Sequence, residues 1–191
     1  MMLRKILVNA VLFVALSGGV GFATAHYAIE SGPRFVVRHS GPWKQWTMLG
    51  RPDADPYARA HMVRRGMLPV AATAETSYFA DSDSAGGWLN TACEYRLVVA
   101  NFKGAWWSIA VYTRKGLLVA NAAERYAFNS DTAMLEADGR AVVTLARDAR
   151  PGNWLPIGGG GQLVAVLTVQ STPEQEKVAT ALPEIERLGC R

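Results

Sequence analysis

The hydrophobic pattern of the chain begins with a long apolar run. No charged residue lies between Lys5 and Glu30, and Ile6 to Phe22 is mostly Leu, Val, Ala, Phe and Gly. A helix on the surface of a globular domain shows a polar face, and this run has none. It supplies the roughly 20 apolar residues that a membrane-spanning helix needs. The pattern therefore predicts one transmembrane or signal helix within residues 1–29, in membrane contact over residues 6–25.

Beyond residue 70 the hydrophobic period shortens to that of β-strands. Short alternating stretches are separated by turns rich in Gly and Asp, and Asp138-Gly139 is a strong hairpin signal. The predicted strands are residues 77–80, 93–99, 107–113, 117–119, 134–136, 141–145 and 162–170. In the last of these, the alternate residues Leu163, Ala165, Leu167 and Val169 share one face. This spacing predicts a mainly β domain, an antiparallel β-sandwich or jelly roll, over residues 55–191.

Two helices flank the predicted strands. Asp55 suits an N-cap, Pro56 the first helical position and Gly66 the C-terminal cap, which predicts a short soluble helix at the N-terminal side of the domain. Its predicted apolar face holds Tyr57, Ala60 and Val63, with His61 at the surface. Thr172 and Pro173 begin a capping-box pattern that predicts a C-terminal helix.

Residues 30–54 read as an irregular linker, because Gly-Pro pairs and single glycines interrupt any period. A free linker rarely contains two tryptophans, and this one contains Trp43 and Trp46. We therefore expect the segment to dock on the domain.

Charge before the apolar run predicts the membrane topology. Arg4 and Lys5 favour a cytoplasmic N-terminus, which places the domain in the periplasm of a bacterial cell, with one pass through the inner membrane. Ala23-Thr24-Ala25 is also a small-x-small pattern suited to signal-peptidase cleavage. Both outcomes stay open: the helix is a membrane anchor, or signal peptidase cleaves the chain after Ala25 and releases the domain into the periplasm. Export is common to both.

Composition narrows the function classes. Charged residues make up 19% of the chain, its net charge is only +4, and no Lys/Arg cluster of the nucleic-acid-binding kind occurs, so nucleic acid is not an expected partner. The two cysteines, Cys93 and Cys190, fit an oxidising compartment. They are either two separate buried thiols or a disulfide that ties the C-terminal end to a central strand, which is the reading we favour.

No catalytic or metal-binding motif is recognisable. The glycine run 158–161 precedes a strand pattern and lacks the Gly-Lys-Ser/Thr of a phosphate loop. The three histidines lack the spacing of metal ligands, and no Gly-x-Ser-x-Gly elbow is present. Asp81 and Asp83 lie in a predicted turn and are interpreted as solvated. We therefore expect no cofactor and no metal, and favour a non-enzymatic role.

Two clusters mix aromatic and polar side chains. Asn121 is followed by Arg125 and Tyr126, and Asn153 by Trp154. Such mixtures are typical of sugar-binding or peptide-binding surfaces. They are equally typical of β-sandwich corners, where polar side chains satisfy backbone groups of loops. Both interpretations are kept, with the five residues as candidate binding residues.

At these clusters the sequence resembles the bacterial "domain of unknown function 1214" family, of a short, membrane-anchored envelope type. The resemblance is carried by Trp106 to Tyr112, Asn121 with Arg125-Tyr126, Asn153-Trp154-Leu155-Pro156, the helix start Asp55 to Ala60, and the ending from Leu182 to Cys190. It implies a jelly-roll β-sandwich, and it adds Asp55, Tyr57 and Arg59 to the candidate binding residues. The family often occurs with a "domain of unknown function 1254", which implies a separate partner protein carrying that domain. The chain has Thr168-Val169-Gln170 where the family tends to have an arginine-aromatic strand.

The sequence therefore leads to two hypotheses. The first is a membrane-anchored periplasmic domain that binds a partner protein or an envelope glycan. The alternative is an enzyme acting on an envelope glycan or a small extracytoplasmic substrate, in which Asp55, Arg125, Tyr126 and Asn153 converge on one pocket.

Overall fold

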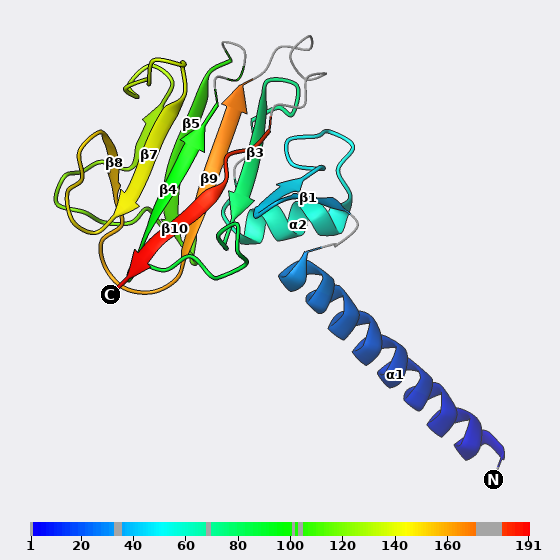
Figure 1. Ribbon diagram of the computed structural model, residues 1–191. Coiled ribbons are helices and arrows are strands. Elements are labelled where there is room, and N and C mark those ends of the chain that lie inside the picture. The colour runs from blue at the N-terminus through cyan, green and yellow to red at the C-terminus, as the bar shows by residue number, and fades with distance from the viewer. Residues whose placement is uncertain (1, 33–35, 68–69, 101, 103–104, 171–180) are drawn as a thin grey trace.

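The computed structural model describes residues 2–32, 36–67, 70–100, 102, 105–170 and 181–191. Over these residues the chain is mainly β, with two sheets, a short helix beside them and an N-terminal apolar helix that projects from the domain (Figure 1).

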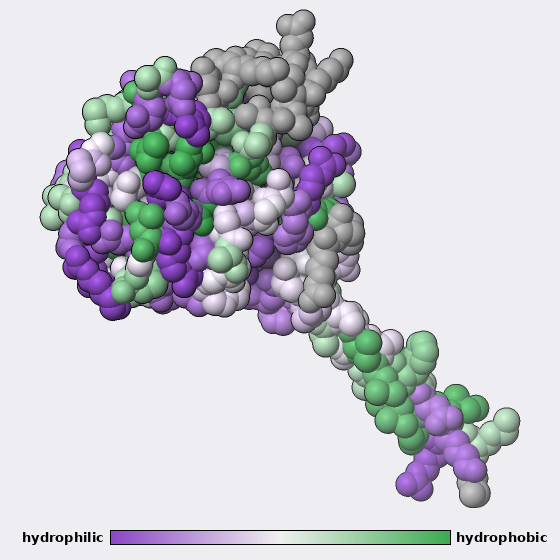
Figure 2. All heavy atoms as spheres, viewed as in Figure 1, coloured by the Kyte–Doolittle hydropathy of each residue, from purple (hydrophilic) through white to green (hydrophobic). Residues whose placement is uncertain are grey.

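The N-terminal helix, α1, runs from Met2 to Ser31 and has no buried residue. Figure 2 shows it as a mostly hydrophobic rod leaving the domain, with hydrophilic residues near its free end. At 1.5 Å per residue it is about 45 Å long. Of the helices in the described residues, α1 is the one that is long and apolar enough to cross a membrane.

The larger sheet has the order β1-β2-β3-β9-β5-β6, and all its neighbours are antiparallel. Its strands are β1 (Val37–Ser40), β2 (Trp43–Trp46), β3 (Glu75–Ala80), β9 (Leu163–Gln170), β5 (Trp107–Thr113) and β6 (Ala127–Asn129). The β1–β2 hairpin means that residues 30–54 are not irregular throughout, as the punctuation of glycines and prolines had suggested. Trp43 docks this segment: its indole is buried and donates a hydrogen bond to the carbonyl of Pro183 at 2.6 Å.

The smaller sheet has the order β10-β4-β7-β8. Its strands are β10 (Ile185–Cys190), β4 (Cys93–Val99), β7 (Ala141–Ala146) and β8 (Asn153–Pro156). β8 runs parallel to β7, so the expectation of purely antiparallel sheets is wrong at this pair. Residues 153–156 are not among the strands that the hydrophobic pattern predicts.

Side chains from both sheets form one hydrophobic core. Leu97 of β4, Ile109 of β5 and Leu167 of β9 are fully buried in it. The alternate residues of β9 named above share the buried face, as the period had predicted, because successive side chains of a strand point to opposite faces.

The Asp138-Gly139 turn is present, but the strand predicted before it is not. Gly139 has φ +79°, and the amide of Glu136 donates to the carbonyl of Arg140 at 2.7 Å. In place of the strand predicted over 134–136, the described residues show a single bridge, between Leu135 and Ala141. The strand predicted over 117–119 is likewise reduced to one bridge between Tyr112 and Leu118.

The C-terminal end of the chain is a strand. The helix predicted from Thr172 falls in residues 171–180, which lie outside the described residues. Residues 185–190 form β10 and pair with β4. Cys93 and Cys190 face each other in this pairing and form a disulfide, with their Cα atoms 3.9 Å apart. The separation of 97 residues makes it a long-range link between the end of the chain and a central strand.

Candidate functional site

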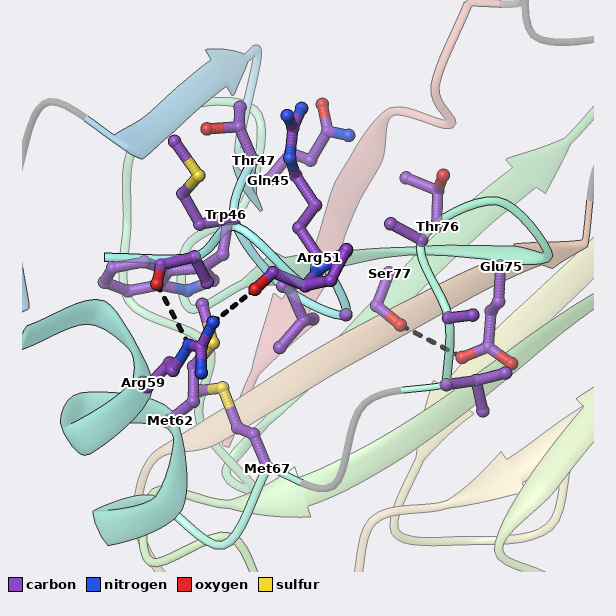
Figure 3. A pocket seen from close by; sticks show the side chains of 18 of the residues that line it. Gln45, Trp46, Thr47, Arg51, Arg59, Met62, Met67, Glu75, Thr76 and Ser77 are labelled. Carbon is purple, nitrogen blue, oxygen red and sulfur yellow. Dashed lines mark hydrogen bonds between the residues drawn. The ribbon is translucent and has the colours of Figure 1, made fainter. Parts of the chain in front are cut away.

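The main surface feature of the described residues is an open groove of about 1190 Å³ beside α2 (Pro56–Arg64) (Figure 3). One wall is the loop from Trp46 to Ala54, another is α2 with the residues that follow it, and the third is the first half of β3 with the chain leading to it. Three successive segments of the stretch between Gln45 and Ser77 thus enclose it.

The lining of the groove is mixed, with a group of apolar side chains among polar ones. Met62 is buried together with Val36 and Ala58, and Trp46 and Met48 pack against this small cluster. Val63 and Val70 also line the groove and are exposed, at 74% and 54%. Methionine side chains are flexible and polarisable, so a surface rich in them adapts to apolar groups of varied shape.

Charged side chains stand at the rim. Arg59 donates from Nε to the carbonyl of Ala54 at 2.9 Å and also bonds the carbonyl of Pro52, which fixes the guanidinium against the loop. Arg51 and Asp53 form an exposed pair at 2.7 Å. The hydrogen bond from Arg51 lowers the pKa of the Asp53 carboxyl, and this pairing raises the pKa of Arg51.

One edge of β3 is open towards the groove. β2 pairs with β3 only at Lys44↔Phe79 and Gln45↔Tyr78, and the two strands then diverge. On its other side β3 pairs with β9 along its whole length. Within the described residues, the stretch 75–77 therefore has a strand neighbour on one side only, and these three residues line the groove. An open strand edge is a template for an added strand.

The end of α1 is docked against α2 next to the groove. His61 Nδ1 lies 2.6 Å from the carbonyl of Ile29, and Arg64 Nε lies 2.5 Å from the carboxylate of Glu30. The His61 ring also packs against Trp46, with ring centroids 4.7 Å apart. Since His61 is buried, its predicted surface position is wrong.

The predicted site residues of the helix start have mainly local roles. Asp55 caps α2 by accepting hydrogen bonds from the amides of Tyr57 and Ala58 at 2.9 and 3.2 Å. The buried face of the helix is Ala58, His61 and Met62, and the expected face with Tyr57 and Val63 is exposed. Of the three candidates here, Arg59 lines the groove.

The Asn121 loop is closed by its own side chain. Asn121 Nδ2 donates to the carbonyls of Val119 and Arg125 at 3.1 and 2.9 Å, and its Oδ1 accepts from the Arg125 amide at 3.0 Å. Arg125 donates to the carbonyl of Trp154 at 3.0 Å and lies over the Trp154 ring at 5.9 Å. Tyr126 is exposed beside them. The structure thus brings the two predicted aromatic–polar clusters together.

Asn153 supports the fold at this corner. It is buried, its Nδ2 donates to the carbonyls of Met134 and Val142 at 2.8 and 3.0 Å, and its Oδ1 accepts from the Met134 amide at 2.7 Å. Trp154 donates from Nε1 to the carbonyl of Ala146 at 2.9 Å. The polar groups of Asn153 and Trp154 are thus bonded to backbone groups of the domain rather than directed to a ligand.

The candidate residues do not form one pocket. α2 lies at the β1–β2 end of the larger sheet, whereas Arg125 and Tyr126 precede β6 at its other edge, with β3, β9 and β5 between them (Figure 1). Asp55 therefore does not converge with Arg125, Tyr126 and Asn153. In the described residues, no group of three or more His, Cys, Asp or Glu side chains is arranged to hold a metal ion.

The groove itself was missed at the sequence level. Its methionines, Met48, Met62 and Met67, are scattered over a loop, a helix and a helix end, and only the fold brings them together. The one local signal was the pair of tryptophans in residues 30–54, which indicated that this segment is part of the domain.

Fold and groove together define a mainly β protein with an N-terminal apolar helix and a surface groove beside α2. The chain belongs to the family described as "Protein of unknown function (DUF1214)", whose model matches residues 74–174. No curated protein matches the chain.

Two solved structures match the chain. The VPA0106 protein from Vibrio parahaemolyticus is 19% identical, with a TM-score of 0.55, and the match covers 72% of this chain and 36% of that one. An uncharacterised protein from Burkholderia cenocepacia is 14% identical, with a TM-score of 0.43 over 92% of this chain and 43% of that chain. This chain thus spans about a third of the length of the Vibrio protein, and the likeness concerns the fold alone.

Proposed function

We propose that the protein is an exported envelope protein, held in the bacterial inner membrane by α1, whose β domain binds a partner protein through the groove beside α2. The observation that carries the proposal is the groove itself, with methionine and valine side chains among polar ones and the open edge of β3.

The physical character of α1 supports the anchor. The helix is apolar along most of its length and has no buried residue, so in water it would expose a large hydrophobic surface. Arg4 and Lys5 precede the apolar run, which favours a cytoplasmic N-terminus and a periplasmic domain.

The surroundings of Ala25 favour an anchor over a cleaved signal. Ala23 to Ala25 lie inside a continuous helix, where Thr24 Oγ1 donates to the carbonyl of Val20 at 2.8 Å. Proteolytic cleavage prefers exposed, irregular chain. Ile29 and Glu30, a few residues further on, are fixed to α2.

The groove fits an extended segment of another protein. The Glu75 amide already donates to the carbonyl of Ala71 at 3.2 Å, and the remaining backbone groups of residues 75–77 can extend the sheet by a short strand. The apolar side chains of the lining accept alternate side chains of that strand. The charged side chains of Arg59, Arg51 and Asp53 at the rim can orient the bound segment through hydrogen bonds and ion pairs. The resemblance makes a protein carrying a "domain of unknown function 1254" the first partner to test.

A glycan site at Asn121, Arg125 and Trp154 is the weaker candidate. The amide and guanidinium groups there already bond to carbonyls within the domain, so few polar groups are left for sugar hydroxyls. For the same reason, and because Asp55 lies at the other end of the sheet, an enzyme using these residues has less support than a binding protein.

We also propose that the two sheets form a sandwich of jelly-roll type. The shared core of side chains from both sheets supports this interpretation.

The partner is tested by affinity purification of the full chain from membranes in mild detergent, with mass spectrometry of what co-purifies. The variant V63E/V70E places two carboxylates on exposed apolar positions of the groove and is expected to lose the partner. M134E/L135E is the matched control, since these side chains are similarly exposed, at 61% and 57%, and lie outside the groove. Recovery of the same partner with both variants, or a lone monomer from the wild type, would contradict the proposal. The intact mass of the membrane-bound chain separates the anchor from cleavage at Ala25.

A further inference from the structure

The surface around the exit of α1 from the domain is organised by Arg65. Its guanidinium lies 3.4 Å from the carbonyl of Glu30 at the end of α1. Its own carbonyl lies 3.5 Å from the point where a Cβ of Gly116 would stand. The end of α1, the end of α2 and the loop of residues 114–118 therefore meet at this residue.

The loop has an unusual composition for a turn. Arg114 and Lys115 come first and Leu117 and Leu118 follow, and all four side chains are exposed, the leucines at 65% and 48%. Arg114 lies over the ring of Trp88 at 5.4 Å, and this tryptophan is itself 54% exposed. Single exposed leucines are ordinary, but two adjacent ones beside cations and a tryptophan form an amphipathic surface.

The charge of this surface is positive. Its cations are Arg64, Arg65, Arg114 and Lys115. Within the described part of the chain, only Arg64 of these four pairs with a carboxylate, that of Glu30. We call these four residues, with Leu117 and Leu118, the basic–leucine end.

We infer that the basic–leucine end binds the anionic phospholipid headgroups of the membrane that α1 spans, an inference that rests on the anchoring part of the proposed function. The position fits, because α1 leaves the domain at Arg65 and so brings this end to the bilayer surface. The chemistry fits as well. Cations attract anionic headgroups, leucines enter the boundary between headgroups and acyl chains, and tryptophan favours that same boundary.

The register of β9 separates the loop of residues 114–118 from the β3 wall of the groove. Thr113, which precedes the loop, pairs with Leu163 at the start of β9, whereas Glu75 in the groove pairs with Gln170 at its end. The two points lie about 24 Å apart along the strand. The α2 wall of the groove, at Val63 and Met67, adjoins Arg64 and Arg65, whereas the β3 wall stays open to a periplasmic partner when the loop contacts lipid.

The test measures how fast Lys115 reacts with an uncharged, water-soluble amine reagent in the full-length protein. The protein is placed in nanodiscs of phosphatidylcholine alone or of phosphatidylcholine with phosphatidylglycerol, and acetylation of Lys115 is followed by mass spectrometry. We expect the reaction to be about fivefold slower with phosphatidylglycerol, which is the effect of roughly one basic residue held at an anionic surface.

Variants separate the two parts of the surface. R65Q/R114Q is expected to remove the difference between the two lipids, and L117S/L118S to speed labelling in both. M134S/L135S is the matched control and is expected to behave as the wild type. Met134 and Leu135 follow the turn at Ser130, whose amide donates to the carbonyl of Trp107 at the start of β5, whereas Leu118 bridges Tyr112 near the end of β5.

Equal labelling in both nanodiscs and in detergent would overturn the inference while leaving the anchor intact. The anchor is checked separately by alkaline extraction of cell membranes. A chain that is released by this treatment would overturn the anchoring and the lipid contact together.

Discussion

Asp83 and Arg187 form an ion pair across the junction between the loop after β3 and strand β10. Asp83 Oδ2 lies 2.7 Å from Arg187 Nη2, and the aspartate side chain is only 2% exposed, against 35% for the arginine. Asp83 Oδ1 accepts hydrogen bonds from the amides of Ala85 and Gly87 at 3.1 and 2.8 Å. The carboxylate thus organises a turn, and its charge is balanced by Arg187, which lies 104 positions later in the sequence.

The two partners are expected to respond differently to neutral substitution. Arg187→Gln leaves a buried carboxylate without its counter-ion and should lower the free energy of unfolding by about 3 kcal/mol. Asp83→Asn keeps an oxygen for the two amides and leaves only a half-exposed guanidinium, so about 1 kcal/mol is expected. Urea unfolding of the domain, followed by tryptophan fluorescence, measures both. Equal losses for the two variants would show that burial of the charge is not the deciding factor.

This pair also shows where sequence reasoning stops. The Asp81 to Gly87 stretch reads as a turn, and it is one, but turn composition alone suggests solvated aspartates. Asp83 is buried because β10 lies over it, and Asp81 pairs with Lys44 of β2 at 2.7 Å. Both partners are remote in sequence, so no local pattern reports them.

A second prediction concerns the Cys93–Cys190 disulfide. On the chain-entropy model, a link across 97 residues stabilises the domain by about 4–5 kcal/mol, because it restricts the unfolded chain. Reduction should therefore lower the urea midpoint, and C93A/C190A should match the reduced wild type and ignore reductant. A double variant as stable as the oxidised protein would contradict this.

The strands that could be predicted are those with one fully buried face. β4, β5 and β9 alternate between buried and partly exposed residues along nearly their whole length, and the predicted bounds of β4 and β5 match the observed ones. β10 has a single buried residue, Ile185, and so carries no alternation. β8 ends in Pro156, which argues against a strand in a sequence.

Helix caps were readable from the sequence, whereas the buried face of α2 was not. Asp55 caps the helix through bonds to the next few amides, a purely local arrangement. The face that is buried depends on Ile29, which lies 32 residues before His61. The groove has a related character: its walls follow one another between Gln45 and Ser77, but their arrangement around a hollow depends on how loop, helix and strand pack.

The docking of α1 on α2 gives a third prediction, through Gly32. This glycine has φ +71°, and a Cβ there would collide with the Trp46 ring. Gly32→Ala should therefore loosen the junction and speed limited proteolysis between α1 and the domain. Gly41→Ala is the control, since Gly41 has φ +57° but open space around it and would suffer only the backbone strain of about 1–2 kcal/mol. Similar proteolysis of both variants would mean that the Trp46 contact does not hold the junction.

The last prediction concerns alkaline pH and Tyr95. Burial raises the pKa of the Tyr95 hydroxyl above its ordinary value of 10.0, although the Asn90 amide that bonds its oxygen and the charge of Arg187 oppose this. A raised pKa in the folded state means that the unfolded state releases its proton first. The contribution of this group to stability is therefore complete below about pH 10 and is lost as the pH rises through the folded pKa.

We expect the free energy of unfolding to fall more steeply in the wild type than in Tyr95→Phe between roughly pH 9.5 and 11, a range set by the reference pKa of tyrosine. The variant loses the hydrogen bond to Asn90 at every pH, so the comparison is of slopes rather than of absolute stability. Parallel pH profiles for the two proteins would assign the alkaline loss to other groups.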